Sequence, residues 1–204
     1  MYTVVGLGNP GSEYDDTRHN AGRIMARLLM EEGEVRLKEQ KKPKSWVGTG
    51  EVVGEKVRLI LPDTFMNKSG SAVTPYIKSV GAAKKLIVMY DDIDLPLGTV
   101  RVSFGSSSGG HNGIKSVERA VKTKNYIKIR MGVAKPGKKK GSVVAKKPDG
   151  DDATIDYLLG KFTKAELEKL TGPIKERVFL ALTTIFETGD PTMGMNAVNG
   201  LPAL

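Results

Sequence analysis

The side chains of this chain that could carry out acid–base chemistry are few. The chain has only two histidines, His19 and His111. Asp91 directly follows the apolar run Leu86–Tyr90, which reads as a buried strand. A neutral imidazole can take a proton from water, and a carboxylate beside it can orient the ring and stabilise the imidazolium. These residue types allow a water-activating site, although a lone histidine also serves as an ordinary structural residue.

Other polar and aromatic side chains also follow predicted strands. They are Asn9, Tyr14, Phe65, Met66, Asn67 and Asn112. Open α/β sheets place their ligand crevices at the carboxyl ends of strands, so these side chains are candidates for substrate contacts. An amide offers both a donor and an acceptor, but asparagine is also a common turn and cap residue. The residues alone therefore leave two classes open, a hydrolytic and a nucleic-acid-binding α/β domain.

Two glycine motifs suggest other sites and fail on their surroundings. Gly6, Gly8 and Gly11 spell G-x-G-x-x-G, but Pro10 lies inside the motif, and no acidic residue ends a second strand about 20 residues later. The stretch 105–109 spells G-x-S-x-G, yet only His111 follows it, with no acid between. We therefore expect no dinucleotide cofactor and no serine nucleophile. With no cysteine and two histidines without a third ligand, we expect no metal.

Strand-length apolar runs alternate with amphipathic stretches along the chain. This order predicts one α/β domain with an open, mixed, twisted sheet flanked by helices. The predicted strands are Tyr2–Leu7, Trp46–Val53, Lys56–Leu61, Leu86–Tyr90, Val100–Phe104 and Tyr126–Val133. The predicted helices are Ala21–Glu32, Ala72–Val80, Gly113–Val121, a short helix capped by Thr163 and Glu166, and a last helix from Pro173 to Thr188.

Two segments look irregular by composition. Residues 135–150 mix glycines with a lysine run and predict a basic loop, whereas residues 189–204, rich in Gly, Pro, Asn and Met, predict a loose tail. The expected organisation is therefore a domain over residues 1–188, with the basic loop inside it, followed by a C-terminal tail over 189–204.

The charge balance gives the only global hint of a partner. The chain of 204 residues has a net charge of +9, and such a surface attracts polyanions. Its first residues lack a charged region followed by an apolar one, and no run of about 18 apolar residues occurs. We expect a cytoplasmic protein that does not bind membranes.

At this point the sequence resembles the bacterial-type peptidyl-tRNA hydrolase family. The matching segments recur in family order from Val4 to about Leu170. They are VVGLGNPGSEYDDTRHNAG, FMNKSGSAV, YDDIDLPLGTVRV, SSSGGHNGIKSVERAV, YIKIRMGVAKP and YLLGKFTKAEL. The first and the fourth are long and specific. The resemblance implies the fold of that family and hydrolysis of the ester that joins a peptide to the terminal ribose of tRNA.

The resemblance also implies roles for individual residues. His19 matches the family's essential histidine, and Asp91 matches the carboxylate beside it, in a mechanism that needs no metal or cofactor. The substrate-binding positions are Asn9, Tyr14, Phe65, Met66, Asn67, His111 and Asn112, with His111 in a supporting role. A site built to pair with a peptide group would discriminate against free aminoacyl-tRNA.

For the tRNA phosphates, the resemblance implies a clamp at Arg130, and Lys115 and Arg119 lie on one basic helix face. The chain departs from the family at Ser103, where a clamp lysine is common; Arg101, on the same face of the strand, could replace it. The implied partner is peptidyl-tRNA. Because no feature of the sequence demands a partner surface, we expect a monomer. The alternative is a non-catalytic RNA-binding relative that acts in splicing, which would not require the whole polar set.

Overall fold

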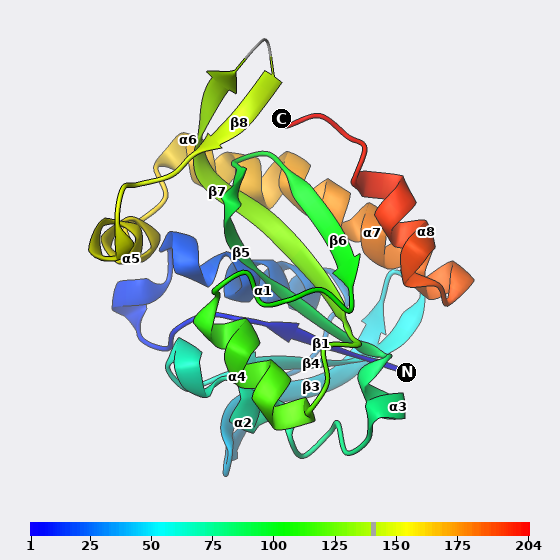
Figure 1. Cartoon of the computed structure of the whole chain (residues 1–204). Coiled ribbons are helices and arrows are strands. Elements are labelled where there is room, and N and C mark those ends of the chain that lie inside the picture. Colours follow the sequence, from blue (N-terminus) through cyan, green and yellow to red (C-terminus); the bar gives the residue numbers. More distant parts are fainter. Residues whose placement is uncertain (140–141) are drawn as a thin grey trace.

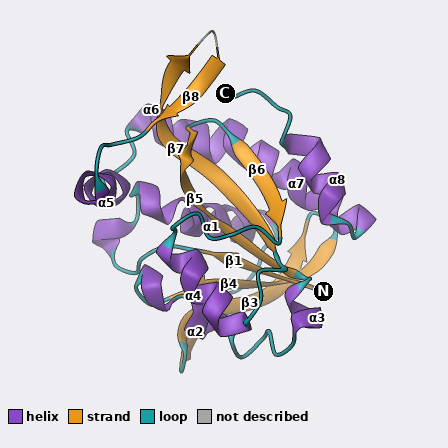
Figure 2. Cartoon of the chain, in the orientation of Figure 1, coloured by secondary structure: helices purple, strands orange, loops and turns teal. Residues whose placement is uncertain are grey.

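A twisted sheet runs through the molecule with helices on both faces (Figures 1 and 2). The computed structural model describes residues 1–139 and 142–204. The described strands are β1 (Tyr2–Gly6), β2 (Lys38–Lys41), β3 (Lys44–Val52), β4 (Glu55–Pro62), β5 (Leu86–Pro96), β6 (Val100–Phe104), β7 (Ile127–Lys139) and β8 (Ser142–Lys146). The described α-helices are α1 (Ala21–Glu32), α2 (Gly70–Val73), α3 (Val80–Ala83), α4 (Asn112–Val121), α5 (Asp151–Leu159), α6 (Lys164–Lys169), α7 (Lys175–Thr188) and α8 (Pro191–Val198).

The strand order brings the carboxyl ends of four strands to one edge. The order is β2-β3-β4-β1-β5-β7-β6, with β8 paired to β7. Strand β1 pairs in parallel with both β4 and β5, and β5 pairs in parallel with β7. The other pairings are antiparallel. Chain connections that leave β1, β4 and β5 therefore meet at one edge, as predicted. The prediction is wrong for the strand before Asn112, because β6 runs antiparallel to β7 and its carboxyl end lies at the opposite edge.

Alternating apolar side chains on the central strands build a core on each face of the sheet. Val4 packs in the core that contains α1, α7 and α8, whereas its neighbour Val5 packs in the core that contains α2 and α4. Both valines are fully buried. Because successive strand residues point to opposite faces, a continuous apolar run such as Leu86–Tyr90 feeds both cores, and this explains its composition.

Most predicted elements are present, and one predicted helix is wrong. Strand β6 has the predicted bounds, and β5 extends beyond Tyr90 to Pro96. The predicted helix Ala72–Val80 is instead two short helices, α2 and α3, because Pro75 interrupts the pattern. Thr163 and Glu166 form the predicted capping box. Pro173 does not begin a helix; it lies in a π-turn (Leu170–Ile174) that joins α6 directly to α7.

The prediction of a basic loop over residues 135–150 is wrong, because strands β7 and β8 cover most of this segment. Strand β7 continues to Lys139 and pairs antiparallel with β8, from Lys135 opposite Lys146 to Lys139 opposite Ser142. This hairpin projects from the body in Figure 1. Residues 140 and 141, which the prediction also covered, lie outside the described residues. The glycine and lysine composition did not reveal this strand pairing, in which the two backbones bond to each other.

The prediction of a loose tail over residues 189–204 is also wrong, because helix α8 lies within this segment. Asp190 accepts a bond from the Thr192 amide at 2.8 Å and caps α8, whose first residue is Pro191. Helix α8 packs on α7 and β6 (Figure 1). Asn199 then donates to and accepts from the backbone of Val102, at 2.9 and 2.7 Å. The segment therefore completes the domain. Among the described helices, none combines the length and the apolar character needed to cross a membrane.

Candidate active site

His19 and Asp91 form a close pair at the carboxyl edge of the sheet. His19 lies in a 3₁₀ turn (Arg18–Asn20) that leads into α1, and Asp91 lies on β5. The Nδ1 atom of His19 is 2.9 Å from Oδ2 and 3.0 Å from Oδ1 of Asp91. An ionised carboxylate can only accept, so Nδ1 carries the proton and Nε2 keeps its lone pair. The His19 side chain is 14% exposed and Asp91 only 1%, so the pair has one accessible end, the imidazole.

His111 is the second partner of Asp91. Its Nε2 is 3.0 Å from Asp91 Oδ1, and its Nδ1 accepts the backbone amides of Gly113 and Ile114 at 3.1 and 3.3 Å. His111 is thus the N-cap of α4. Two amide donors at Nδ1 require the lone pair there, so the proton is on Nε2 and points to Asp91. The structure thereby brings the two histidines and the aspartate together.

The pKa values of the pair follow from burial and mutual charge. Burial lowers the pKa of His19, but the charge of Asp91 and the hydrogen bond to it outweigh burial, and the pKa is raised above 6.5. Burial raises the pKa of Asp91, yet His19 and His111 together lower it far below its usual value. Asp91 therefore remains ionised, and His19 is the group of the pair that titrates.

The same three residues form the candidate metal group among the described residues. Their donor atoms lie within 4.8 Å of one another. However, the amides of α4 hold the lone pair of His111 on Nδ1, so Nε2, the atom that faces Asp91, is occupied by a proton. Binding a metal through Nε2 would place a proton on Nδ1 against two N–H donors. The donor set therefore fits a hydrogen-bonded cluster better than a metal site.

Asn20 and close glycine packing hold the loop that carries Asn9. The amide of Asn9 donates to Asn20 Oδ1 at 2.8 Å, and Asn20 Nδ2 donates back to the Asn9 carbonyl at 3.0 Å. A Cβ on Gly22 would overlap the carbonyl of Met89, so only glycine lets α1 start this close to β5. Gly11 has a φ of +105°, which lets the chain turn after Pro10. The glycine motif thus serves a turn and close packing.

The Asn9 side chain is only half available to a ligand. Its Oδ1 accepts the amide of Met66 at 2.8 Å, which leaves Nδ2 as the group for a substrate. Met66 is buried, and Phe65, which precedes it, lies edge to face with Tyr14, with ring centroids 6.5 Å apart. Phe65 is 59% exposed, unusually high for phenylalanine. These residues form an apolar and aromatic border beside Asn9.

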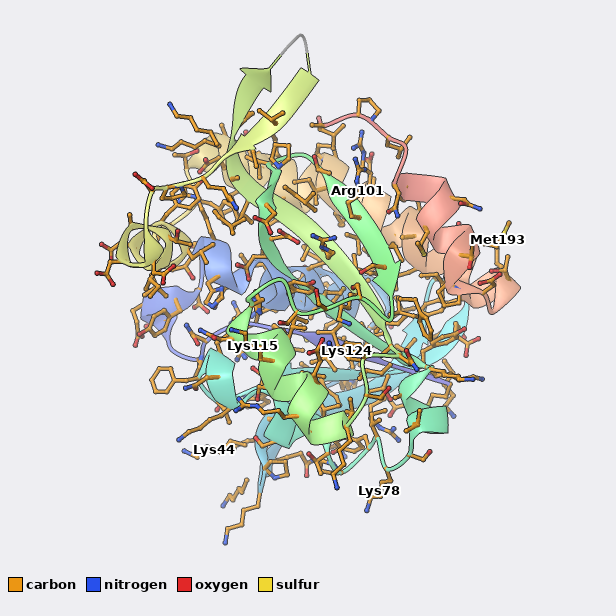
Figure 3. The ribbon with its side chains drawn as sticks, in the orientation of Figure 1. Lys44, Lys78, Arg101, Lys115, Lys124 and Met193 are labelled. Atoms are coloured by element: carbon orange, nitrogen blue, oxygen red, sulfur yellow. The ribbon has the colours of Figure 1, made fainter. Side chains whose placement is uncertain are left out.

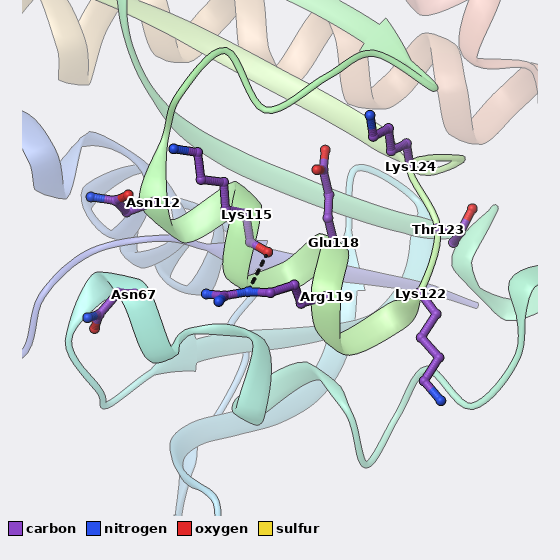
Figure 4. Close-up of a pocket in the computed structure, with 8 residues that line it drawn as sticks. All are labelled: Asn67, Asn112, Lys115, Glu118, Arg119, Lys122, Thr123 and Lys124. Carbon is purple, nitrogen blue, oxygen red and sulfur yellow. Dashed lines mark hydrogen bonds between the residues drawn. The ribbon is translucent and has the colours of Figure 1, made fainter.

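Asn67 and Asn112 lie on a basic cavity of about 630 Å³ along α4 (Figure 4). The other lining residues are Lys115, Glu118, Arg119, Lys122, Thr123 and Lys124. Lys115 and Arg119 are exposed, and the Arg119 Nε donates to the Lys115 carbonyl at 3.3 Å. Figure 3 shows Lys115 and Lys124 along the same helix and the loop that follows it. The cavity links the two predicted asparagines to a cationic surface.

Arg130 and Arg101 lie opposite each other on β7 and β6, so their side chains share one face of the sheet. Arg130 Nε donates to Asp92 Oδ2 at 2.6 Å. Arg101 Nη1 is 3.5 Å from the carbonyl oxygen of Leu201, near the C-terminal segment (Figure 3). Ser103, two register pairs further along, lies opposite Lys128. The structure thus places two guanidinium groups near the predicted clamp position, one of them paired with an acid.

Sequence reasoning did not single out Asn20 or Arg18, the two neighbours of His19. Asn20 is fully buried, and Arg18 is 8% exposed and bonded to Glu166 Oε2 at 2.9 Å. The doublets His19-Asn20 and His111-Asn112 were the available signal for Asn20. No local pattern connects Arg18 with Glu166, because 148 residues separate them.

Comparison with known proteins agrees with this geometry. The family model "Peptidyl-tRNA hydrolase" matches residues 3–203. The chain is 38% identical over 201 residues to the peptidyl-tRNA hydrolase of Alkaliphilus oremlandii, covering 98% of this chain and 100% of the relative. It is 37% identical to that of Syntrophotalea carbinolica, covering 98% and 97%. The crystal structure of the Acinetobacter baumannii peptidyl-tRNA hydrolase matches with a TM-score of 0.83 at 30% identity, covering 99% of this chain and 96% of that one. The chain belongs to the peptidyl-tRNA hydrolase family.

Proposed function

We propose that this protein hydrolyses the ester between a peptide and the terminal ribose of tRNA, with His19 as general base and Asp91 as its orienting carboxylate. One observation carries the assignment. The Nδ1 of His19 is held by Asp91 at 2.9 Å, so Nε2 of a partly exposed ring keeps the lone pair that can accept a proton from water.

Water, His19 and Asp91 supply every group that this reaction needs. Water loses a proton to Nε2 of His19 as its oxygen bonds to the acyl carbon, and Asp91 stabilises the imidazolium that forms. The ester C–O bond then breaks, and the proton passes from Nε2 to the departing ribose oxygen. The ribose alkoxide is a better leaving group than an amine, so an attacking water with a base is sufficient. His111 supports the reaction indirectly, because it donates its Nε2 proton to Asp91 rather than facing the substrate.

The residues around the pair would read the peptide and the tRNA end. Asn9 Nδ2, whose partner oxygen is held by Met66, can donate to a peptide carbonyl. Asn67 and Asn112 lie on the cavity rim and offer further amides. The exposed Phe65 ring, with Tyr14 edge-on to it, suits stacking with a base. Such pairing favours a blocked, peptide-like substrate over free aminoacyl-tRNA.

The cationic surface would hold the phosphates. Lys115 and Arg119 line the same cavity as Asn67 and Asn112, so an RNA strand bound at these asparagines would meet them. Arg130 and Arg101, side by side across β6 and β7, would form a second phosphate contact in place of the lysine that Ser103 replaces.

The test is a hydrolysis assay with N-acetyl-aminoacyl-tRNA and, separately, unblocked aminoacyl-tRNA, in the presence of a chelator. We expect turnover of the blocked substrate only. His19→Ala should lower kcat by roughly 100- to 10,000-fold, the usual contribution of a general base, while the Kd for tRNA stays unchanged. Wild-type protein that binds tRNA without turnover would contradict the proposal and would leave a non-catalytic RNA-binding protein.

A further inference from the structure

Lys128, which the mechanism above does not use, is a fully buried lysine on β7. Its side chain is 0% exposed, and lysine is rarely so buried without partners. The Nζ atom donates to the carbonyl of Ser106 at 2.7 Å and to that of Lys124 at 3.3 Å. Ser106 precedes α4 and Lys124 follows it. One ammonium group therefore joins the two loops at either end of the helix whose N-cap is His111.

The surroundings of Lys128 direct it to these carbonyls. Glu118 on α4 is the nearest acid, with its Oε1 at 3.7 Å, which is beyond a normal hydrogen bond. The ring of Tyr126 lies 4.0 Å from Nζ and contributes a cation–π contact. The cationic groups that act on Lys128 are Lys124 and Arg130. The two loop carbonyls are thus its closest polar partners.

The loop that Lys128 holds is the one that delivers His111. Gly105, Gly109 and Gly110 all have positive φ, and a Cβ at Gly109 or Gly110 would meet nothing within 4 Å. Among the described side-chain contacts, residues 105–110 are held at Ser106, by Lys128 and by the Ser103 hydroxyl at 2.9 Å. Five residues later, His111 bonds to Asp91. An otherwise open loop is therefore fixed at one point.

We propose that Lys128 is a positioning residue of the hydrolytic site: its ammonium group fixes Ser106 and so sets the loop that places His111 against Asp91. The inference rests on the proposed function. It assigns no substrate contact to Lys128, which is sealed from the cleft. It predicts that the orientation of Asp91, and through it that of His19, depends on a charge buried between β7 and α4.

The charge state of Lys128 makes this dependence measurable. Burial lowers the pKa of Lys128 to about 8; Glu118 opposes this shift, and Lys124 and Arg130 add to it. Above pH 8 the neutral amine binds the two carbonyls more weakly than the ammonium does. We therefore expect kcat to decline at alkaline pH with a midpoint near 8. This decline is separate from the rise of the rate at lower pH, where His19 loses its proton.

The experiment compares pH profiles of the wild type, Lys128→Arg, Lys128→Met and the exposed control Lys78→Met, from pH 5.5 to 9.5, after subtraction of spontaneous ester hydrolysis. Lys128→Arg keeps its charge throughout and should lose the alkaline decline. Lys128→Met should lower kcat about tenfold with KM little changed and no alkaline limb, and Lys78→Met should match the wild type. An alkaline limb with an unchanged midpoint in Lys128→Arg, or a wild-type kcat and profile in Lys128→Met, would overturn the proposal.

Amide hydrogen exchange of residues 106–113 reads the same interaction without any substrate, so its failure can be told apart from failure of the proposed function. Opening free energies obtained from exchange, corrected for the intrinsic pH dependence, should fall through pH 8 in the wild type and stay constant in Lys128→Arg. Constant values in the wild type would show that Lys128 does not hold the loop, whether or not the protein hydrolyses peptidyl-tRNA.

Discussion

Asp91 accepts hydrogen bonds from two imidazoles whose tautomers are fixed in different ways. His111 is fixed by two amides of α4, and His19 is fixed by Asp91 itself. The carboxylate is therefore held from one side by a capped ring and holds the other ring in turn. This arrangement leaves one nitrogen of the cluster, Nε2 of His19, with an available lone pair. The proposed mechanism therefore makes activity depend on the protonation of a single ring, that of His19.

The fall of the rate at acid pH should follow the protonation of His19. Because its pKa is raised above 6.5 and only the neutral ring accepts a proton, kcat/KM should rise about tenfold per pH unit below that pKa and level off above it. Asp91→Asn removes the charge that raises the pKa but keeps the burial that lowers it. The limb should therefore move to lower pH in this variant, alongside a large loss of rate.

The measurement is kcat/KM from pH 5 to 8, together with an NMR titration of the His19 ring. The titration needs no turnover and therefore covers a variant of low activity. An acid limb at the same pH in Asp91→Asn and wild type would show that Asp91 does not control the protonation of His19.

The segment that contains α5 and α6 fastens the loop that carries His19. The backbone amide of Arg18 donates to the Gly160 carbonyl at 3.1 Å, and that of Phe162 donates to the Asp16 carbonyl at 2.9 Å. The Arg18 guanidinium donates from Nη2 to Glu166 Oε2 at 2.9 Å, and its Cζ lies 4.3 Å from the centre of the Tyr157 ring. Because His19 directly follows Arg18, this clasp is expected to restrict the ring that activates water.

Glu166→Gln tests the clasp, since glutamine can still complete the capping box with Thr163 but carries no charge for Arg18. Removal of the ion pair should lower the free energy of unfolding by about 1.5–3 kcal/mol. kcat should fall about five- to tenfold, because a loosely held base reaches the attack geometry less often. Thermal unfolding and steady-state kinetics measure both. Exposed Glu168 on the same helix provides the control, Glu168→Gln; equal effects of the two variants would refute the clasp.

At the scale of the whole molecule, the net charge of +9 attracts polyanions such as RNA. Four of the cations, Lys115, Arg119, Lys122 and Lys124, line one cavity that also contains Asn67 and Asn112. Each phosphate that a cation neutralises releases counterions, so tRNA affinity should fall steeply with salt. Electrostatics at this scale governs capture rather than bond cleavage.

The double variant Lys115→Gln/Arg119→Gln should reduce the slope of log K against log[salt] by roughly one unit for each phosphate that is no longer neutralised, while kcat at saturating tRNA stays near the wild-type value. Binding measured at several salt concentrations tests this. The control Lys56→Gln/Lys78→Gln removes the same charge from exposed positions outside the cavity. A slope that changes equally in both pairs would assign the effect to net charge alone.

The sequence by itself determined the elements whose signals are local. Apolar runs predicted six of the described strands, but not β2 or β8. The amphipathic pattern predicted α1 and α4, and the Thr163 and Glu166 spacing predicted a capping box. Motif resemblance also named candidate site residues, whose roles stay predictions. Composition failed at residues 135–150 and 189–204, where it suggested irregular chain and long-range pairing produced β8 and α8.

Only the tertiary structure decided how those residues act on one another. Asp91 bonds to two histidines, Arg18 pairs with Glu166, and Lys128 holds Ser106 in the loop before α4. These contacts join residues 20 to 148 apart in sequence. Such contacts leave no periodic trace, because a hydrogen bond depends on position in space and is indifferent to separation along the chain. Local propensity fixes an element's type; packing fixes which polar atoms face each other, and that choice sets tautomers and pKa values.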